Sequence, residues 1–479
     1  MRPKLRVFLQ STALAIAAAV AGVSGAQAQS EKDIHLDAAT RNTGGDKFLK
    51  DWTRDRYCMY VDNPALLAEI RTHTAPVAPM QIFDDVWYVG FENVGQFVVK
   101  NAGGYVLIDA LNRATDIDNY TIPTLQSLGL YPQASLLGVF LTHGHFDHDG
   151  GAPRLRDIYG SGFPIYLGSG DAGGKTYSPT LLDSANLGYQ QLSLGGRPMT
   201  VISSPGHTPG TTSSFIPVRE NGKEHLLLIV GGTAIPTTVA ASRSYVASVE
   251  RMYAAAKDLG AVGTLHPHPI IDGGNQHMAD IAARGSRTPN PYILGKEKLL
   301  RTVAIMRECG AAQVGQVDAT AKTPVWRVTS VAFDAQSPSP SRLAARVQSD
   351  WGPVVGQEVK FSVGTSGAAC VAVTDSTGLA TCASLPTLRA RDEVTASYAG
   401  SSSADFVNLP GSRTALVASL ACDIDGNGSV DRNDIGAIVA AIGKPVAAGD
   451  ARDADGDGRT SISDARMCTL RCTKEQCAP

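Results

Sequence analysis

The stretch LTHGHFDHDGG, residues 141–151, places three of the chain's ten histidines and two aspartates within seven consecutive positions. Residues 136–142, LLGVFLT, form an apolar run of strand length, so the cluster should follow a buried strand. Gly144, Gly150 and Gly151 should let the backbone turn tightly, so that several side chains converge. Imidazole is the commonest metal ligand in proteins, and Zn²⁺ accepts nitrogen and carboxylate together. The stretch therefore predicts a metal site rather than a solvated loop.

Two later stretches supply further histidines. His207 lies in SSPGHTPGTTS, residues 203–213, after the expected strand MTVIS. His266 and His268 lie in TLHPHP, residues 264–269, beyond a helix expected to end near Gly260. Each stretch places histidine after an apolar segment, as the first one does.

Strands and helices alternate around these stretches. A strand-like pattern of residues begins near Met80. Two later stretches, residues 245–260 and 292–308, have apolar residues at helical spacing. The apolar faces expected on these helices are Val246, Val249, Met252 and Ala256, and Leu299, Val303 and Met306. Mixed strands and helices indicate an α/β layered domain ending near residue 320. Residues 29–80 look like a mixed leader segment that precedes this domain.

Five segments resemble the metallo-β-lactamase superfamily, in that family's order: GGYVLIDA, LTHGHFDHDGG, SSPGHTPGTTS, LLLIVGGTAIP and TLHPHP. They span about residues 80–285. The resemblance implies an αββα sandwich, with two metals at one edge of the sheets. It also implies that Asp109, at the end of GGYVLIDA, supports the metal loop.

One departure narrows the resemblance. Many superfamily hydrolases, glyoxalase II types included, have a bridging Asp after the LLLIVG strand, where this chain has Gly231-Gly232-Thr233. The lactamase subclass that lacks a ligand there recruits a third histidine. The sequence PHP at 267–269 is similar to the corresponding sequence of that subclass. Thr233 remains as a small polar lip of the pocket. The resemblance then implies one zinc on His143, His145 and His207 and a second on Asp147, His148 and His268, with His266 as the fallback ligand.

These residue types suit hydrolysis. Three neutral nitrogens leave a tetrahedral zinc one open position, and zinc lowers the pKa of bound water to about 7. Asp147 is the expected catalytic residue, because it can orient the resulting hydroxide. The resemblance favours hydrolysis of β-lactams, with lactones, esters or thioesters as the alternative small-molecule substrates. A third hypothesis is a calcium-stabilised surface or scaffold-binding protein with a vestigial metal site.

The composition changes after residue 322, and residues 323–412 predict a small β-sandwich. Residues 374–378, TDSTG, predict a hairpin turn that sets Cys370 opposite Cys382 in neighbouring strands, close enough for a disulfide. CVAVTDSTGLATC resembles bacterial immunoglobulin-like domains.

Two copies of one acidic pattern, DIDGNGSVDRND (423–434) and DADGDGRTSISD (453–464), lie in the last segment, 418–479. Oxygen side chains at loop positions 1, 3, 5 and 12 with Gly at 6 are EF-hand spacing, so a small helical module with two Ca²⁺ ions is expected. The helix after the first copy should present Ile435, Ile438, Val439 and Ile442 on one face. The copies resemble dockerin modules, which implies a protein partner; a stability module stapled by the four flanking cysteines is the alternative. The expected calcium ligands are Asp423, Asp425, Asn427, Ser429, Asp434, Asp453, Asp455, Asp457, Arg459 and Asp464, with Ser429 and Arg459 acting through backbone carbonyls.

The N-terminus predicts export. A basic start, an apolar Ala-rich stretch and the small-x-small site Ala26-Gln27-Ala28 indicate a signal peptide over residues 1–28, ahead of a hydrolase domain at 29–322. The mature chain is then periplasmic or secreted, where cysteines form disulfides. The eight cysteines divide evenly by region, although the last four allow three connectivities. A net charge of −3 favours neither nucleic acid nor an anionic membrane as partner.

Overall fold

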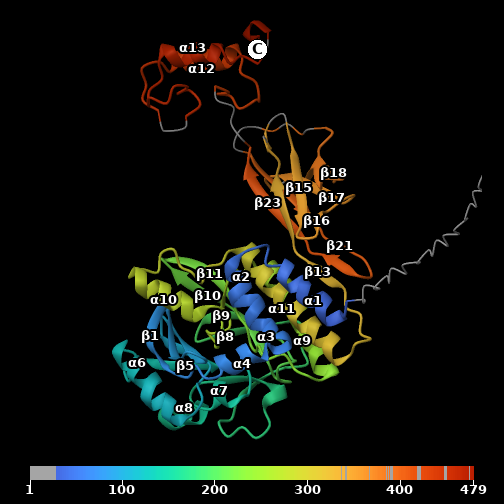
Figure 1. Cartoon of the computed structure of the whole chain (residues 1–479). Helices are drawn as coiled ribbons and strands as arrows, with labels where there is room; N and C mark the ends of the chain where they lie inside the picture. The colour runs from blue at the N-terminus through green and yellow to red at the C-terminus, as the bar shows by residue number, and fades with distance from the viewer. Residues whose placement is uncertain are drawn as a thin grey trace, which may run out of the picture.

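Three bodies follow one another along the chain in the computed structural model (Figure 1). The structure describes residues 29–335, 337–339, 342–365, 367–384, 386, 388, 392–417, 422–446, 450–473 and 475–478. The predicted signal peptide, residues 1–28, lies outside the described residues. A search of the described helices finds none with the length and hydropathy needed to cross a membrane.

Two sheets form the centre of the first body. One has the order β1-β2-β3-β4-β5-β6-β7, antiparallel from β1 to β4 and parallel from β4 to β7. The other has the order β12-β11-β10-β9-β8. The strands are β1 (Pro76–Phe83), β2 (Val86–Phe91), β3 (Gly95–Asn101), β4 (Gly104–Ile108), β5 (Ser135–Phe140), β6 (Ile165–Gly168), β7 (Thr180–Leu182), β8 (Tyr189–Leu194), β9 (Arg197–Ser203), β10 (Thr212–Glu220), β11 (Lys223–Ile229) and β12 (Gly263–Leu265).

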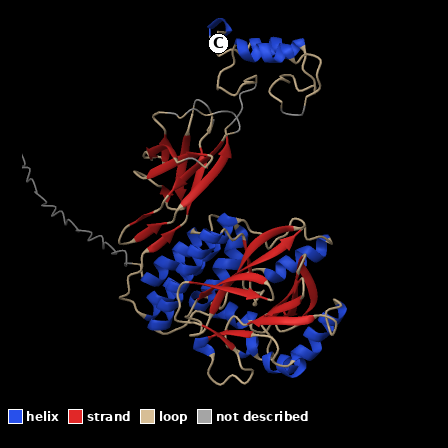
Figure 2. Ribbon diagram, turned by 180° about the vertical axis from the view of Figure 1, so that it is seen from behind, coloured by secondary structure: helices blue, strands red, loops and turns tan. Residues whose placement is uncertain are grey.

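Helices cover the outer faces of both sheets (Figure 2). They are α1 (Glu31–Arg41), α2 (Lys47–Leu49), α3 (Asp55–Asp62), α4 (Pro64–Ile70), α5 (Ala114–Asp116), α6 (Ile122–Ser127), α7 (Phe146–Asp149), α8 (Ala152–Tyr159), α9 (Val239–Leu259), α10 (Gly274–Arg284) and α11 (Lys296–Val317). Short 3-10 or π turns supplement them, among them η3 (Ser169–Asp171).

Three apolar layers give this body its αββα order, as predicted. Phe140 and Met199 pack between the two sheets. Val139, the neighbour of Phe140 on β5, points to the opposite face and packs with Leu155 of α8. Val249 of α9 belongs to the third layer, which also holds the buried residues of α3 and α11. The faces predicted on α9 and α11 are buried as expected.

The interpretation of residues 29–80 as a mixed leader is wrong. Four helices occupy most of this segment, and α1 and α3 pack against α11. His35 Nδ1 lies 2.6 Å from Glu308 Oε2, with both side chains buried. A disulfide joins Cys58 of α3 to Cys309 of α11. The segment is therefore part of the outer helical layer.

The second body is mostly β-sheet and packs around its own apolar core. Its strands are β13 (Val325–Arg327), β14 (Thr329–Phe333), β15 (Ala344–Ser349), β16 (Gly352–Pro353), β17 (Glu358–Val363), β18 (Ala368–Val373), β19 (Leu379–Thr381), β20 (Glu393–Tyr398), β21 (Ser401–Ser402), β22 (Phe406–Asn408) and β23 (Gly411–Leu416). Cys370 bonds to Cys382, and the chain turns at residues 375–378 as predicted, with Gly378 N donating to Asp375 O, but the two flanking strands do not pair with each other. β18 pairs with β17 while β19 pairs with β15, so the disulfide links two sheets.

The third body holds α12 (Arg432–Ala440), α13 (Ile462–Thr469) and a short turn, η4 (Glu475–Cys477). Disulfides join Cys422 to Cys468 and Cys472 to Cys477, which selects one of the three connectivities. The apolar face expected on α12 is only partly buried. Ile438 is fully buried, whereas Val439 and Ile442 are 52% and 42% exposed.

Candidate metal centre

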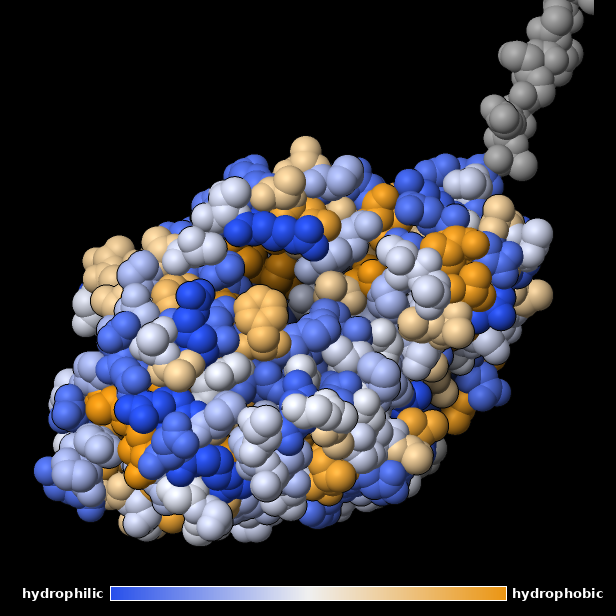
Figure 3. Space-filling model, turned by 90° about the horizontal axis from the view of Figure 1, so that it is seen from below, coloured by the Kyte–Doolittle hydropathy of each residue, from blue (hydrophilic) through white to orange (hydrophobic). Residues whose placement is uncertain are grey.

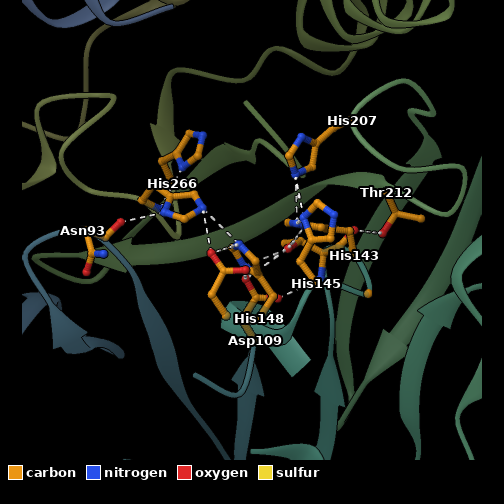
Figure 4. Close-up of polar contacts among 12 residues, drawn as sticks. Asn93, Asp109, His143, His145, His148, His207, Thr212 and His266 are labelled. Atoms are coloured by element: carbon orange, nitrogen blue, oxygen red, sulfur yellow. Dashed lines mark hydrogen bonds and ion pairs between the residues drawn. The ribbon is translucent and has the colours of Figure 1, made fainter. Parts of the chain in front are cut away.

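Four chain segments bring the predicted ligands to one edge of the sandwich (Figure 4). Asp109 follows β4, and the 141–151 stretch follows β5, the parallel neighbour of β4. His207 lies between β9 and β10, and His268 follows β12 in the second sheet. Thr212 N donates to Thr142 O at 2.9 Å, which ties the start of β10 to the residue after β5. Figure 3 shows that the molecule is hollowed on the face turned to the viewer, with residues of mixed hydropathy around the opening.

His143, His145 and His207 form the first cluster. His143 Nε2 lies 3.0 Å from His145 Nδ1, and His207 Nε2 lies 3.1 Å from each of those atoms. The three nitrogens therefore form a nearly equilateral triangle. Tetrahedral zinc with nitrogen ligands at about 2.0–2.1 Å has ligand separations close to this size.

His148, His268 and Asp147 form the second cluster. The Nε2 atoms of His148 and His268 are 3.0 Å apart, and Asp147 Oδ2 lies 3.6 and 3.7 Å from them. Both clusters belong to one site, because His143 also lies within ligand reach of Asp147 and His148.

The nitrogens that point away from the clusters face hydrogen-bond acceptors. His148 Nδ1 lies 2.7 Å from Asp109 Oδ2, and His268 Nδ1 lies 2.6 Å from the Asn93 carbonyl. His207 Nδ1 lies 3.0 Å from the Ala234 carbonyl. An acceptor at one ring nitrogen holds the proton there, so the other nitrogen presents its lone pair to the cluster.

The surroundings keep most of these rings neutral. Burial lowers the pKa of His143 well below its usual value, and burial lowers the pKa of His207 and of His268 to about 4. Burial also opposes charge on His148, but the Asp109 carboxylate outweighs it and raises the pKa. For Asp147, burial is outweighed by His148 and His268, so its pKa is lowered and the group is ionised.

Asp109 supports the loop as the resemblance implies. Its carboxylate is fully buried and accepts from Thr142 N at 2.7 Å and Thr142 Oγ1 at 3.0 Å, besides its contact with His148. Its φ of 63° is unfavourable for a residue with a side chain, and such strain is typical of functional sites.

Neighbouring backbone approaches the glycines of this loop too closely for a side chain, although their φ angles are ordinary. Gly150 and Gly151 have φ of −61° and −87°, which other residues adopt readily. A Cβ on Gly150 would lie 1.9 Å from Asn112 O, and one on Gly151 would lie 2.2 Å from Ala110 O. Gly150 and Gly151 thus lie in the expected turn, between α7 and α8, and their lack of a side chain permits the close packing there.

The Gly231-Gly232-Thr233 segment packs against His207 and does not form the polar lip expected at Thr233. A Cβ on Gly232 would lie 2.5 Å from His207 Cδ2, so the ring of His207 occupies the space a side chain would need. Thr233 is only 3% exposed, so the expected polar lip is wrong.

His266 lies outside both clusters. Its ring is buried, its Nδ1 accepts from His268 N at 2.9 Å, and its Nε2 has no hydrogen-bond partner among the described residues. The carbonyls of Asn93 and Ala234 are contributors that the sequence analysis missed. Backbone groups leave no signal in residue identity, so only the chain path reveals them.

The two acidic loops of the third body share most of their hydrogen bonds. Asp423 accepts from Gly428 N at 2.8 Å, and Asp453 accepts from Gly458 N at 2.9 Å. The carboxylates at loop positions 1, 3 and 12 gather in each copy, as Asp423, Asp425 and Asp434 and as Asp453, Asp455 and Asp464. Asn427 and Asp457 each accept the N–H two residues ahead, from Ser429 and Arg459.

Comparison with known proteins finds one matching family model and several similar proteins. Residues 89–223 match the family model of the metallo-beta-lactamase superfamily. A hydroxyacylglutathione hydrolase of Shewanella halifaxensis is 27% identical over 137 residues, 28% of this chain and 45% of that protein. The corresponding protein of Shewanella pealeana is 27% identical over 192 residues, 38% of this chain and 61% of that protein. The chain thus spans about half the length of these curated relatives.

Solved structures of metallo-beta-lactamases are similar to about half of the chain. That of a subclass B3 enzyme of Bradyrhizobium japonicum has 23% identity and a TM-score of 0.39, covering 50% of this chain and 92% of that one. A metallo-beta-lactamase of Cronobacter sakazakii has 27% identity and a TM-score of 0.40, covering 50% and 95%. The part of the chain that matches the superfamily's family model, residues 89–223, lies within the first body.

Proposed function

We propose that the protein is an exported dinuclear zinc hydrolase that opens β-lactam rings. One zinc is held by His143, His145 and His207, and the other by Asp147, His148 and His268. The observation that carries this proposal is the set of facing imidazole nitrogens, 3.0–3.1 Å apart. Nitrogen lone pairs that face each other at such distances repel, so a shared cation would stabilise the arrangement.

The donor set suits zinc, because it combines neutral imidazoles with one carboxylate. When bound, zinc supplies a Lewis acid for the carbonyl and lowers the pKa of a coordinated water. Asp147 is ionised and its side chain is 25% exposed, so it can accept a hydrogen bond from the attacking water and orient it. Asp109 holds the His148 proton on Nδ1 and so keeps Nε2 available.

Gly232 favours the β-lactam over the thioester. The glyoxalase II types have a bridging Asp after the corresponding strand, and here the His207 ring leaves no room for one. Thioester hydrolysis is the second candidate, because two curated relatives are named hydroxyacylglutathione hydrolases. Export agrees with four disulfides, since such bonds persist in oxidising compartments.

A substrate panel on zinc-loaded protein tests the proposal. Penicillins, cephalosporins, carbapenems, lactones and a glutathione thioester should be assayed side by side, before and after chelation. We expect ring opening of at least one β-lactam class, lost with chelator and restored by zinc. Turnover of the thioester or a lactone with every β-lactam left intact would replace the first candidate by the second.

We also propose that the acidic loops of the third body bind two Ca²⁺ ions. The two carboxylate clusters and the glycine turns, with φ of 83° at both Gly428 and Gly458, support this. Calorimetry on the full zinc-loaded chain should show calcium uptake that disappears when Asp423→Ala and Asp453→Ala are combined. Asp183→Ala, in the first body, is the control that should leave uptake unchanged. Absence of uptake by the unaltered chain would contradict the proposal.

A further inference from the structure

The segment that follows β6 contacts both turns that carry the first histidine cluster. This segment, residues 169–175, includes η3 and reaches across from the first sheet to the loop between β9 and β10. Asp171 Oδ2 accepts from Gly144 N at 2.8 Å and from Thr208 Oγ1 at 2.6 Å. Asp171 Oδ1 accepts from Gly210 N at 2.9 Å. One carboxylate thus joins the residue between His143 and His145 to the residues around His207.

The two peptide groups that flank Gly144 are each held by a side chain of this segment. The Gly144 N–H donates to Asp171, and the Gly144 carbonyl accepts from Lys175 Nζ at 2.5 Å. Lys175 also forms an ion pair with Asp149 at 2.6 Å, and Asp149 accepts from Tyr177 Oη at 2.9 Å. Lys175 is therefore tied to the far end of α7. The contact with Asp171 therefore restrains the peptide between His143 and Gly144, and the contact with Lys175 restrains the peptide between Gly144 and His145.

Backbone packing leaves these loops little freedom to readjust. A Cβ on Gly210 would lie 2.5 Å from Asp171 Cγ, and one on Gly144 would lie 2.8 Å from Asp171 Cβ. A Cβ on Gly168 would lie 2.0 Å from Gly210 O. Close packing of this kind transmits a change at one residue to its neighbours.

We propose that Asp171 is a positioning residue for the first metal position. It sets the separation between the His143–His145 turn and His207, and so the affinity with which those three nitrogens hold a metal. The inference rests on the proposed function, because it assumes that this cluster binds metal. Outer partners of metal ligands, when removed, weaken metal binding by about 10–100-fold.

The test is Asp171→Asn in the full chain. An amide has one oxygen and one NH₂ group, so either Gly210 N–H or the Gly144 and Thr208 donors would face a donor instead of an acceptor. Binding should be followed by Co²⁺ titration, whose visible absorption reports ligand geometry, and by competition of bound Zn²⁺ against a chelator. We expect the affinity of the first position to fall about 10–100-fold, with a changed Co²⁺ spectrum. The second position should keep its affinity.

Two further variants make the result decisive. Asp183 lies in the same region, and it hydrogen-bonds Ala185 and Gln190, which belong to neither histidine turn, so Asp183→Asn should bind metal as the unaltered chain does. Thr208→Val removes only one donor to Asp171, so a smaller loss in the same direction is expected. If Asp171→Asn does not fold, this variant decides the question.

The possible failures are distinguishable. Unaltered protein that takes up no metal would overturn the proposed function itself. Unaltered protein that binds two ions, together with Asp171→Asn that shows the same affinities and the same Co²⁺ spectrum, would overturn the role of Asp171 alone.

Discussion

The assignment of His268 rather than His266 to the second metal position can be tested by a pair of substitutions. His268 Nε2 lies 3.0 Å from His148 Nε2, and its other nitrogen is held by the Asn93 carbonyl. His266 faces away, with Nδ1 accepting from the His268 backbone. His268→Ala therefore removes a ligand, whereas His266→Ala removes a buried support.

The losses of zinc affinity expected for the two substitutions differ enough to be measured. A four-ligand structural zinc site is worth about 10–16 kcal/mol, so one ligand contributes roughly 3 kcal/mol, or about 10²-fold in affinity. His268→Ala should thus reduce tightly bound zinc from about two ions per chain to about one. His266→Ala loses one hydrogen bond of about 0.5–1.5 kcal/mol and leaves a cavity, which lowers the free energy of unfolding. Its zinc content should stay near two, with a loss in affinity of no more than about tenfold.

The assay is elemental analysis after dialysis against graded chelator, with circular dichroism to confirm that both variants are folded. The unaltered chain is the reference for two ions. If folded His266→Ala retains one ion while His268→Ala retains two, the assignment is reversed. His266 would then be the ligand of the second metal position.

Three further substitutions test other parts of the reasoning. Asp147→Asn keeps the side-chain shape but removes the charge that orients water, so turnover of whichever substrate is hydrolysed should fall about 10²-fold or more, and a loss below threefold would contradict this role. Gly232→Ala places a Cβ 2.5 Å from the His207 ring, so zinc content should fall toward one ion per chain, and two tightly bound ions would refute the clash. Burial, partly offset by donors from Gly274 and Thr264, raises the pKa of Asp272 to about 7, above the unfolded value of about 3.9. The folded state then binds the extra proton, so stability is full below about pH 4, falls as pH rises to about 7 and is level above it. Asp272→Asn should abolish this fall in denaturation midpoints measured from pH 4 to 8; an unchanged profile would show that Asp272 is not the titrating group.

Local sequence was sufficient for much of the fold. Strand and helix periodicity depends on residues two to four positions apart, so the buried faces of α9 and α11 could be predicted directly. The 141–151 stretch concentrates three histidines and two carboxylates within one turn, and its chemistry needs no distant partner to be recognised. Regional pairing of the cysteines could also be predicted, since each region held an even number.

Contacts between distant segments were decided by tertiary structure alone. The acceptors of His207 and His268 are the carbonyls of Ala234 and Asn93, and a carbonyl is the same in every residue type, so the sequence cannot mark them. Cys370 and Cys382 are close in sequence, yet their strands joined different sheets, because pairing with β17 and β15 outweighed the local turn. The helices within residues 29–80 are held by partners some 250 residues away, as the bond between Cys58 and Cys309 shows. Periodicity reports which face of an element is buried, whereas the partner that buries it depends on the path of the whole chain.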